Sequence, residues 1–259
     1  MRILVTFAVE AEFAPWRRLR EFSPVRVVPR DSGPVEMWEA DVGDVAVSVY
    51  LTGIAGRFPL EGMQLRETLF RSKPDFAISS GLAGSLRADL LVGSVFVACE
   101  TCTTEGPYAH SADGGLLSIA KSSGACVVPR LLTVDHIVGS REEKAHLGKV
   151  GDAVDMESAN ILKDFEKIQL PAVAIRAVSD GCLEDMPVDF SRCITGKGNV
   201  RMPELLWQLA SRPFAIPALV RFGRQSKQAA SNLIAFLEQF ILATSHSPRP
   251  VIGKEAVTR

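Results

Sequence analysis

The sequence lacks the features of an exported, membrane-spanning or nucleic-acid-binding protein. Its 259 residues hold no apolar run near the roughly 20 residues that a bilayer-spanning helix needs. Lys and Arg total 29 against 30 Asp and Glu, so a net charge of -1 provides no basic footprint for nucleic acid. The first apolar run has no basic start and meets Glu10 and Glu12 at once, unlike a signal peptide. These absences predict a cytoplasmic protein without a transmembrane segment or a nucleic-acid partner.

Cysteine is also scarce. Five cysteines in a chain without export signals favour reduced thiols over a disulfide framework. Cys99 and Cys102 have the spacing of half a zinc site or a redox pair, but no second pair and no suitably spaced histidine accompanies them. We therefore predict no metal site.

The order of apolar runs predicts an α/β fold. Runs rich in β-forming residues alternate with helical patterns, and Gly43-Asp44 separates two of them as a hairpin turn would, so the sheet is expected to be mixed. One domain is predicted over 1–244, with a loose tail over 245–259. Strands are expected at 2–9, 34–41, 45–51, 75–80, 94–100, 126–135, 152–156 and 172–179. Helices are expected at 10–22, 58–73, 113–123, 140–148, 157–167 and 202–211, with one or two more over 214–242.

Three acidic residues each follow an expected strand. Glu12, Glu157 and Asp180 come after the runs that begin at 2, 152 and 172. Two of them have a structural interpretation when taken singly. Asp155 can cap a helix whose dipole favours Glu157 in the first turn, and Asp180 can close an Asx turn. Together the three acids place one carboxylate from each of three strands at one sheet edge, where open α/β sheets bind ligands. This layout indicates catalysis.

Two glycine-bearing turns also follow strands, at 52–56 and 79–85. Glycine lets backbone amides approach a ligand closely, although such turns more often only connect a strand to a helix. Neither turn matches the dinucleotide fingerprint or the P-loop, so no nicotinamide or ATP cofactor is predicted.

These motifs together resemble the purine nucleoside phosphorylase and nucleosidase superfamily over residues 1 to about 190. The resemblance implies a three-layer α-β-α domain around a mixed, partly barrel-like sheet that assembles as a homodimer or a trimer of dimers. The matching motifs, in chain order, are Glu12, Ser80-Gly81-Leu82-Ala83-Gly84, Val154-Asp155-Met156-Glu157-Ser158 and Val178-Ser179-Asp180.

The resemblance assigns roles that suit glycosidic cleavage, in which the sugar becomes cationic and the base anionic. Asp180, kept protonated in a partly buried site and oriented by Ser179, is expected to protonate the purine. Glu157 is expected to accept hydrogen bonds from the ribose hydroxyls, with Met156 packed against the sugar.

On the opposite side of the sugar, the resemblance places the nucleophile. The backbone of Gly81, Ala83 and Gly84 is expected to line that side. Glu12 matches the water-activating glutamate of the methylthioadenosine and S-adenosylhomocysteine nucleosidases, which favours hydrolysis with release of adenine.

Phosphorolysis stays open as an alternative, since the phosphorylases of this superfamily carry arginines near the two glycine turns. Arg17, Arg18 and Arg57 are the candidate phosphate ligands here, although none matches a phosphate motif. The alternatives from other classes are a nucleoside-binding domain without turnover and a hydrolase with Cys102 or Cys182 as nucleophile.

The 5′ substituent of the nucleoside is not determined. Ser158 and the stretch 181–185 depart from the nucleosidase pattern, while 139–147 and 179–190 look closer to the hopanoid-associated phosphorylases, which act on adenosylated hopane lipids. The segment 211–224 mixes apolar residues with arginines, as a lipid surface or a greasy substrate entrance would, but ordinary helix packing with solvated arginines is the favoured interpretation. A lipid-linked nucleoside is therefore a second possible substrate.

Overall fold

The computed structural model describes residues 1–27, 35–55, 73–104, 109–193, 204, 207–208, 211 and 213–245. None of the helices in these ranges has the length and hydropathy needed to cross a bilayer. The strands are β1 (Arg2–Phe7), β2 (Ser23–Val27), β3 (Val35–Val42), β4 (Val45–Leu51), β5 (Phe76–Ser85), β6 (Val95–Thr103), β7 (Ala109–Ser111), β8 (Cys126–Thr133), β9 (Ala153–Asp155) and β10 (Ala172–Asp180). The helices are α1 (Glu10–Leu19), α3 (Gly114–Ser122), α4 (Arg141–Leu147), α5 (Ser158–Lys167), α6 (Phe190–Cys193), the 3-10 turn η1 (Pro213–Ala215) and α8 (Ile216–Ser245).

The sheet is mixed and closes on itself in part. Its order is β10-β6-β8-β9-β5-β1-β4-β3-β2, and a further pairing of β10 with β5 joins five of these strands into a ring. Antiparallel β3 and β4 meet across Gly43, whose φ of +60° suits glycine in a tight turn. The predicted hairpin, mixed sheet and partly barrel-like closure are confirmed.

Strand β5 changes partner along its length. Its residues 76–79 pair with β1, whereas Gly84 and Ser85 pair with β9. The two partner strands therefore diverge, and the backbone of β5 between them needs other hydrogen-bonding partners. This fork lies where the functional side chains gather.

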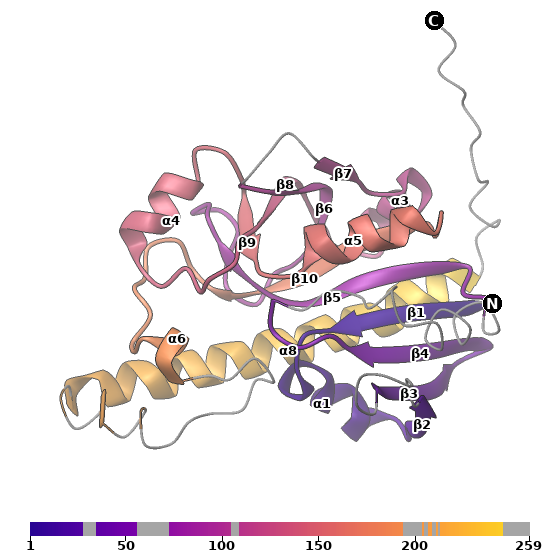
Figure 1. Cartoon of the computed structure of the whole chain (residues 1–259), viewed down its shortest axis with the longest axis horizontal. Coiled ribbons are helices and arrows are strands. Elements are labelled where there is room, and N and C mark those ends of the chain that lie inside the picture. Colours follow the sequence, from indigo (N-terminus) through magenta and orange to yellow (C-terminus); the bar gives the residue numbers. More distant parts are fainter. Residues whose placement is uncertain are drawn as a thin grey trace, which may run out of the picture.

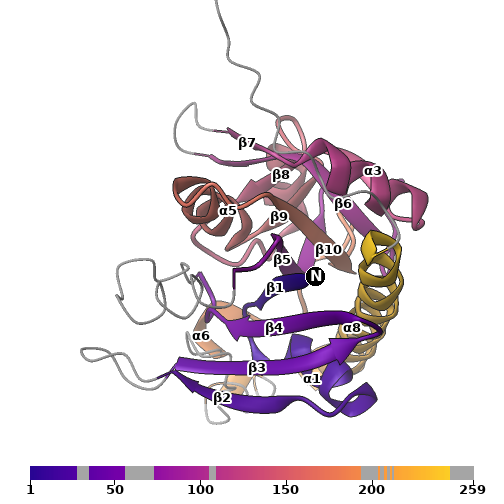
Figure 2. The same cartoon turned by 90° about the vertical axis from the view of Figure 1, so that its right-hand side faces the viewer.

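Helices cover both faces of the strands, which confirms the three-layer architecture. Alternate residues of the strands point to opposite faces, so Val173 and Ile175 belong to one apolar cluster and Ala174 to the other. The first cluster includes side chains of α1, α3 and α8, and the second includes those of α5. Figure 1 shows the element order, and Figure 2 shows α5 and α8 on opposite sides of the strands.

Helix α1 is fixed against α8 by a buried polar contact. Glu238 of α8 accepts a hydrogen bond from Trp16 Nε1 at 2.6 Å and pairs with Arg20 at 2.5 Å. Trp16 is fully buried against Phe7 and Phe22. Because Glu12 lies in the first turn of α1, this packing sets the position of its backbone.

Most of the expected elements are present with shifted ends, and several differ. The strand predicted to reach residue 9 ends at Phe7, and one continuous helix, α8, occupies most of 214–242 and ends at Ser245. The sequence did not predict β2, β7 or α6, which are short or lack a strong apolar pattern. The helix expected at 58–73 lies outside the described residues, apart from its last position. Of the helix expected at 202–211, only residues 204, 207, 208 and 211 are described. The domain limits of 1–244 stay a prediction.

The packing of α8 generates a test of that domain assignment. Phe240 is fully buried and its ring contacts Phe76 edge-on at 6.2 Å between centroids. Phe240→Ala should lower the free energy of unfolding by about 3–5 kcal/mol, because it removes a large side chain from the core. Val220→Ala, at a site 49% exposed on the same helix, should change it by less than about 0.5 kcal/mol. Denaturant titrations measure both changes. If Phe240→Ala changed the free energy of unfolding as little as Val220→Ala does, α8 would not unfold cooperatively with the rest of the domain.

Candidate active site

One cavity brings together the acidic residues predicted from three strands. The cavity measures about 250 Å³, and Glu12, Glu157 and Asp180 all line it. They come from the segments that follow β1 and β9 and from the last position of β10. The convergence at one sheet edge that the sequence indicated is thus present, although their individual roles stay predictions.

Glu12 is held by backbone donors from the turn after β1 and from β5. Its Oε2 accepts hydrogen bonds from the amides of Ala8 at 3.0 Å and Val9 at 3.4 Å, and its Oε1 accepts one from Leu82 at 2.8 Å. Burial raises the pKa of the Glu12 carboxyl, and the Arg176 charge and these amides oppose the rise. Each oxygen has a further lone pair, so the carboxylate can still accept a proton.

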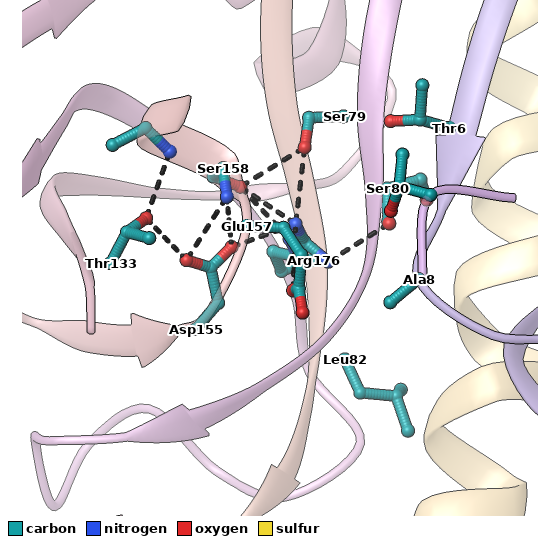
Figure 3. Close-up of polar contacts among 12 residues, drawn as sticks. Thr6, Ala8, Ser79, Ser80, Leu82, Thr133, Asp155, Glu157, Ser158 and Arg176 are labelled. Carbon is teal, nitrogen blue, oxygen red and sulfur yellow. Dashed lines mark hydrogen bonds and ion pairs between the residues drawn. The ribbon is translucent and has the colours of Figure 1, made fainter. Parts of the chain in front are cut away.

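Arg176 is the central cation of the site, and its role was missed in the sequence. It lies on β10 with 1% of its surface exposed and pairs with Asp155 at 2.8 Å. Its guanidinium also donates to Ser158 Oγ at 2.9 Å and to the Ser80 carbonyl at 3.0 Å (Figure 3). A lone arginine inside an otherwise apolar strand run was the available signal, because such a residue is rarely buried without partners.

Gly81 is required by the path of that arginine. Gly81 is the partner of Arg176 across the β5–β10 pair and has a φ of +148°. A Cβ at this position would lie 2.2 Å from Arg176 Nη1 and 2.8 Å from Glu12 Oε1. The guanidinium therefore passes over β5 where no side chain stands. Gly81 acts by leaving this space, whereas Ala83 and Gly84 line the cavity; the predicted contact of all three with the substrate stays a prediction.

Asp155 precedes α5 and stabilises the start of that helix. It accepts a hydrogen bond from the Ser158 amide at 3.1 Å and from Thr133 Oγ1 at 2.6 Å (Figure 3). Thr133 in turn accepts from the Ala159 amide at 2.9 Å. This is the capping role expected of Asp155, and it fixes the residue that precedes the helix, Glu157.

Glu157 faces the cavity beside Arg176 but at a longer distance. Its Oε2 lies 3.9 Å from Arg176 Nη2, and its Oε1 accepts a hydrogen bond from the Ala55 amide at 3.0 Å. Burial raises the pKa of Glu157 to about 7, with the Arg176 charge opposing the rise and the neighbouring Asp155 and Glu12 adding to it. Met156 lines the cavity next to it.

Asp180 lines the same cavity but has different partners from Glu12 and Glu157. The register of β10 against β5 shifts between Val178 and Asp180, and this irregularity lets Ser179 and Asp180 act together. Ser179 Oγ donates to Asp180 Oδ1 at 2.6 Å. The Oδ2 atom accepts from the ammonium of Lys144 at 2.6 Å, a contact that sequence spacing could not show.

Two of the three arginines considered as phosphate ligands, Arg17 and Arg18, do not line the cavity. Arg17 is exposed, pairs with Glu10 at 2.8 Å and stacks over the Trp38 ring at 4.2 Å. Arg18 is also exposed, and Arg57 lies outside the described residues. Among the described residues that line the cavity, none is an arginine or a lysine. Arg17 and Arg18 are therefore not placed to bind an anion there.

Apart from His136 and Ser179, the remaining cavity wall is largely apolar. The rings of Phe190 in α6 and Phe222 in α8 are tilted by 34° to one another with centroids 5.0 Å apart, and both line the cavity with Met186 and Val138. Phe222 falls in the segment 211–224, for which a greasy substrate entrance was one interpretation of the sequence. The contribution of Val138, Met186 and Phe190 was not predicted, because these residues lie far from Phe222 in the chain. This wall offers an apolar surface to part of a ligand.

The cysteine pair does not form a chelating or redox motif. Cys99 and Cys102 are free and lie three positions apart on β6, so their side chains point to opposite faces of the strand. Cys102 and Cys182 are both absent from the described lining of the cavity. Neither is placed as a nucleophile for this site.

The crossing of Arg176 over Gly81 gives a stability test. Gly81→Ala should cost about 2 kcal/mol or more and reduce ligand binding, because the new methyl group displaces Arg176 and strains the backbone. Gly223→Ala is the matched control, since nothing lies within 4 Å of its Cβ position. That helical substitution should stabilise by roughly 0.5–1 kcal/mol. Thermal melting measures both, and a neutral Gly81→Ala would contradict the crossing.

A second test follows from the charge balance at Glu157. Its carboxyl has a pKa of about 7 in the folded protein against 4.5 for the ordinary group. Because the folded state holds this proton more tightly, its stability should fall as pH rises from about 4.5 to 7. Glu157→Gln should flatten that part of the stability–pH profile, leaving it more stable than the parent at pH 8. The expected gain is on the order of 3 kcal/mol at most, at about 1.4 kcal/mol per pKa unit. Parallel profiles would refute this charge balance.

Comparisons with known proteins agree with this architecture. The family model described as phosphorylase superfamily matches residues 2–193. An S-adenosylhomocysteine nucleosidase from Streptococcus pyogenes, in complex with 5-methylthiotubericidin, superposes with a TM-score of 0.67 at 16% identity, over 93% of this chain and 96% of that one. A 5′-methylthioadenosine/S-adenosylhomocysteine nucleosidase from Neisseria meningitidis, in complex with methylthio-immucillin-A, gives 0.64 at 22% identity, over 93% and 98%.

A futalosine hydrolase mutant from Helicobacter pylori gives a TM-score of 0.63 at 16% identity, over 93% of this chain and 98% of that one. At these identities the solved structures establish a shared fold. The family model covers most of the chain and confirms the resemblance found in its motifs. The chain belongs to the phosphorylase superfamily.

Proposed function

We propose that this protein is a nucleosidase that cleaves the N-glycosidic bond of a 5′-substituted adenosine-type purine nucleoside, with water as nucleophile and adenine as a product. The observation that carries the proposal is the single cavity lined by Glu12, Glu157 and Asp180, whose carboxyl groups have three different sets of partners. Separate environments allow carboxyl groups of one type to take different chemical roles.

Glu12 is the base in this proposal. Its raised pKa brings the carboxylate closer to neutral pH, where a general base is most effective, and three amides hold it in one orientation. Water would lose a proton to Glu12 while its oxygen attacks the anomeric carbon. The fixed carboxylate needs no rearrangement at that moment, which lowers the cost of reaching the transition state.

Glu157 and Asp180 divide the substrate between them. Glu157 would accept hydrogen bonds from the ribose hydroxyls, with Met156 against the sugar. Asp180, held through Oδ1 by Ser179, would deliver a proton to the purine as the bond to the sugar breaks. A protonated base is a better leaving group because it departs without a negative charge.

The lining favours water over phosphate. A phosphate dianion needs cationic partners, and no described residue lining the cavity carries an arginine or lysine side chain. The Glu12 carboxylate would also repel such an anion. Phosphorolysis remains the second outcome of the test below.

The apolar wall supports a nucleoside with an apolar 5′ group. Met186, Phe190 and Phe222 present carbon and sulfur surface to the cavity, where a free 5′-hydroxyl would find no partner among these three side chains. A thioether or alkyl substituent matches this surface. A lipid-linked adenosine is the larger member of the same chemical class.

The decisive experiment measures base release with and without phosphate. Adenosine, methylthioadenosine, S-adenosylhomocysteine and a 5′-alkyl adenosine are the substrates, and the sugar product is identified. The parent should release adenine and free sugar without phosphate. Glu12→Gln should lose roughly 10²–10⁴-fold in kcat, the usual contribution of a general base. The acid limb of the parent's kcat/KM profile should lie above pH 4.5, because burial raises the pKa of Glu12.

Glu10→Gln is the matched control. Glu10 lies two residues away on α1 but pairs with Arg17 at the surface, so its substitution should leave turnover unchanged. A strict phosphate requirement with a phosphorylated sugar product would replace hydrolysis with phosphorolysis. Absence of base release from every nucleoside would reject the enzyme proposal in favour of a binding domain.

A further inference from the structure

Lys144 is a buried cation on a helix whose other positions are mostly polar and solvent-facing. It is 0% exposed, and its Nζ donates to Asp180 Oδ2 at 2.6 Å, to the Gly181 carbonyl at 2.9 Å and to the Glu184 carbonyl at 3.2 Å. Every N–H of the ammonium therefore has an acceptor. Burying an ammonium group costs several kcal/mol before its partners compensate. An apolar side chain could pack α4 against the loop after β10, which contains Gly181 and Glu184, without this desolvation cost.

The geometry accommodates two positions of one proton. When the proton lies on Nζ, the pair is an ammonium and a carboxylate. When it moves along the 2.6 Å contact to Oδ2, the amine keeps two N–H groups on the Gly181 and Glu184 carbonyls, and its lone pair faces the new carboxyl O–H. No buried polar group loses its partner in either state, so the transfer needs no rearrangement of the surroundings.

We propose that Lys144 is a positioning residue that supplies, through Asp180, the proton received by the departing base. This inference rests on the proposed function and deepens it. It assigns the acid of the reaction to the Lys144–Asp180 pair, whereas the motifs alone indicated a single protonated carboxyl. Ser179 holds Oδ1 while Lys144 holds Oδ2, so the carboxyl group keeps one orientation throughout.

The proton and electron count closes within the site. The shared proton first moves from Nζ of Lys144 to Oδ2 of Asp180, which leaves a neutral amine and a carboxyl group. As the glycosidic C–N bond breaks, its electron pair goes to the base, which takes this proton and leaves Asp180 as a carboxylate. On the sugar side, water loses a proton to Glu12 as its oxygen bonds to the anomeric carbon. After product release Glu12 returns a proton to solvent and Lys144 regains one, so no further reactant is needed.

Several other ionisable groups surround the pair. Glu184 and Asp185 from the loop and Arg221 from α8 line a small recess beside Lys144 and Asp180, and Arg221 lies 3.8 Å from Glu184. The other ionisable groups on α4 and in the lining of the main cavity include Glu142, Glu143, His146, His136, Glu12, Asp155 and Glu157. Because substitutions of Lys144 leave all of these in place, a difference between two pH profiles reports on the pair.

The test compares Lys144→Met and Lys144→Arg with the parent between pH 5 and 9. For the purine nucleoside that the parent cleaves, Lys144→Met should lose at least tenfold in kcat at pH 8, because Asp180 must then take its proton from solvent. Its alkaline limb should move at least one pH unit lower, and much of the activity should return near pH 5. Lys144→Arg should be slow throughout, since a guanidinium keeps the charge and does not release a proton.

A second substrate separates proton delivery from folding. A 4-nitrophenyl riboside with the same 5′ group has a leaving group that departs without protonation. Both Lys144 variants and Asp180→Asn should cleave it within a few-fold of the parent, although all three are slow on the purine nucleoside. If Lys144→Met does not fold, Lys144→Arg alone still gives this contrast.

Other results would overturn the inference. Parent-like kinetics in Lys144→Arg, an equal loss at every pH in Lys144→Met, or full activity of Lys144→Met at pH 8 would each make Lys144 a structural residue. The same loss on the nitrophenyl riboside as on the nucleoside would do so too. Failure of the parent to cleave any nucleoside would reject the proposed function and this inference with it. If the parent cleaves a nucleoside and the pH profiles of the Lys144 variants match the parent's, only this inference is rejected.

Discussion

The charge balance around Arg176 determines the properties of the whole site. One guanidinium, 1% exposed, lies among the carboxyl groups of Asp155, Glu157 and Glu12. It pairs closely with Asp155 at 2.8 Å, which leaves Glu157 at 3.9 Å and Glu12 influenced through its charge. A single cation cannot compensate the burial of three acids. Burial therefore raises the pKa of Glu12 and of Glu157, because the positive charge of Arg176 offsets it only in part.

The same groups complete the sheet. Where β5 leaves β1 and has not yet met β9, the Ser80 carbonyl accepts from Arg176 and the Leu82 amide donates to Glu12. These side chains satisfy backbone groups that a neighbouring strand would otherwise satisfy. The fork in the sheet and the charged site consequently depend on one another. This explains why the charged side chains of Arg176 and Glu12 can be buried where the backbone hydrogen bonding between β5 and its neighbouring strands is interrupted.

The sequence predicted those features that depend on local pattern. Apolar runs indicated the long strands, and the acids just beyond three of them indicated the cavity. Lys144 gave no local signal, because Glu142, Glu143 and His146 around it describe an ordinary polar helix. Its partner Asp180 lies 36 residues away, and only the folded chain brings the two together. The fork of β5 was equally inaccessible, since strand pairing depends on residues distant in sequence. Arg176 did stand out within an apolar run, but its partners could not be named without the fold.

Under the proposed chemistry, the two ends of the cavity require opposite proton affinities, and the structure supplies opposite surroundings. Glu12 accepts three backbone amides and faces a cation already paired with Asp155, so it is free to take a proton from water. Asp180 touches an ammonium that has one proton to pass and two carbonyls that hold the remaining amine in place. Acid and base are then distinguished by their partners, although both are carboxyl groups. A site arranged this way would transfer one proton at each end of the scissile bond with little movement of the protein.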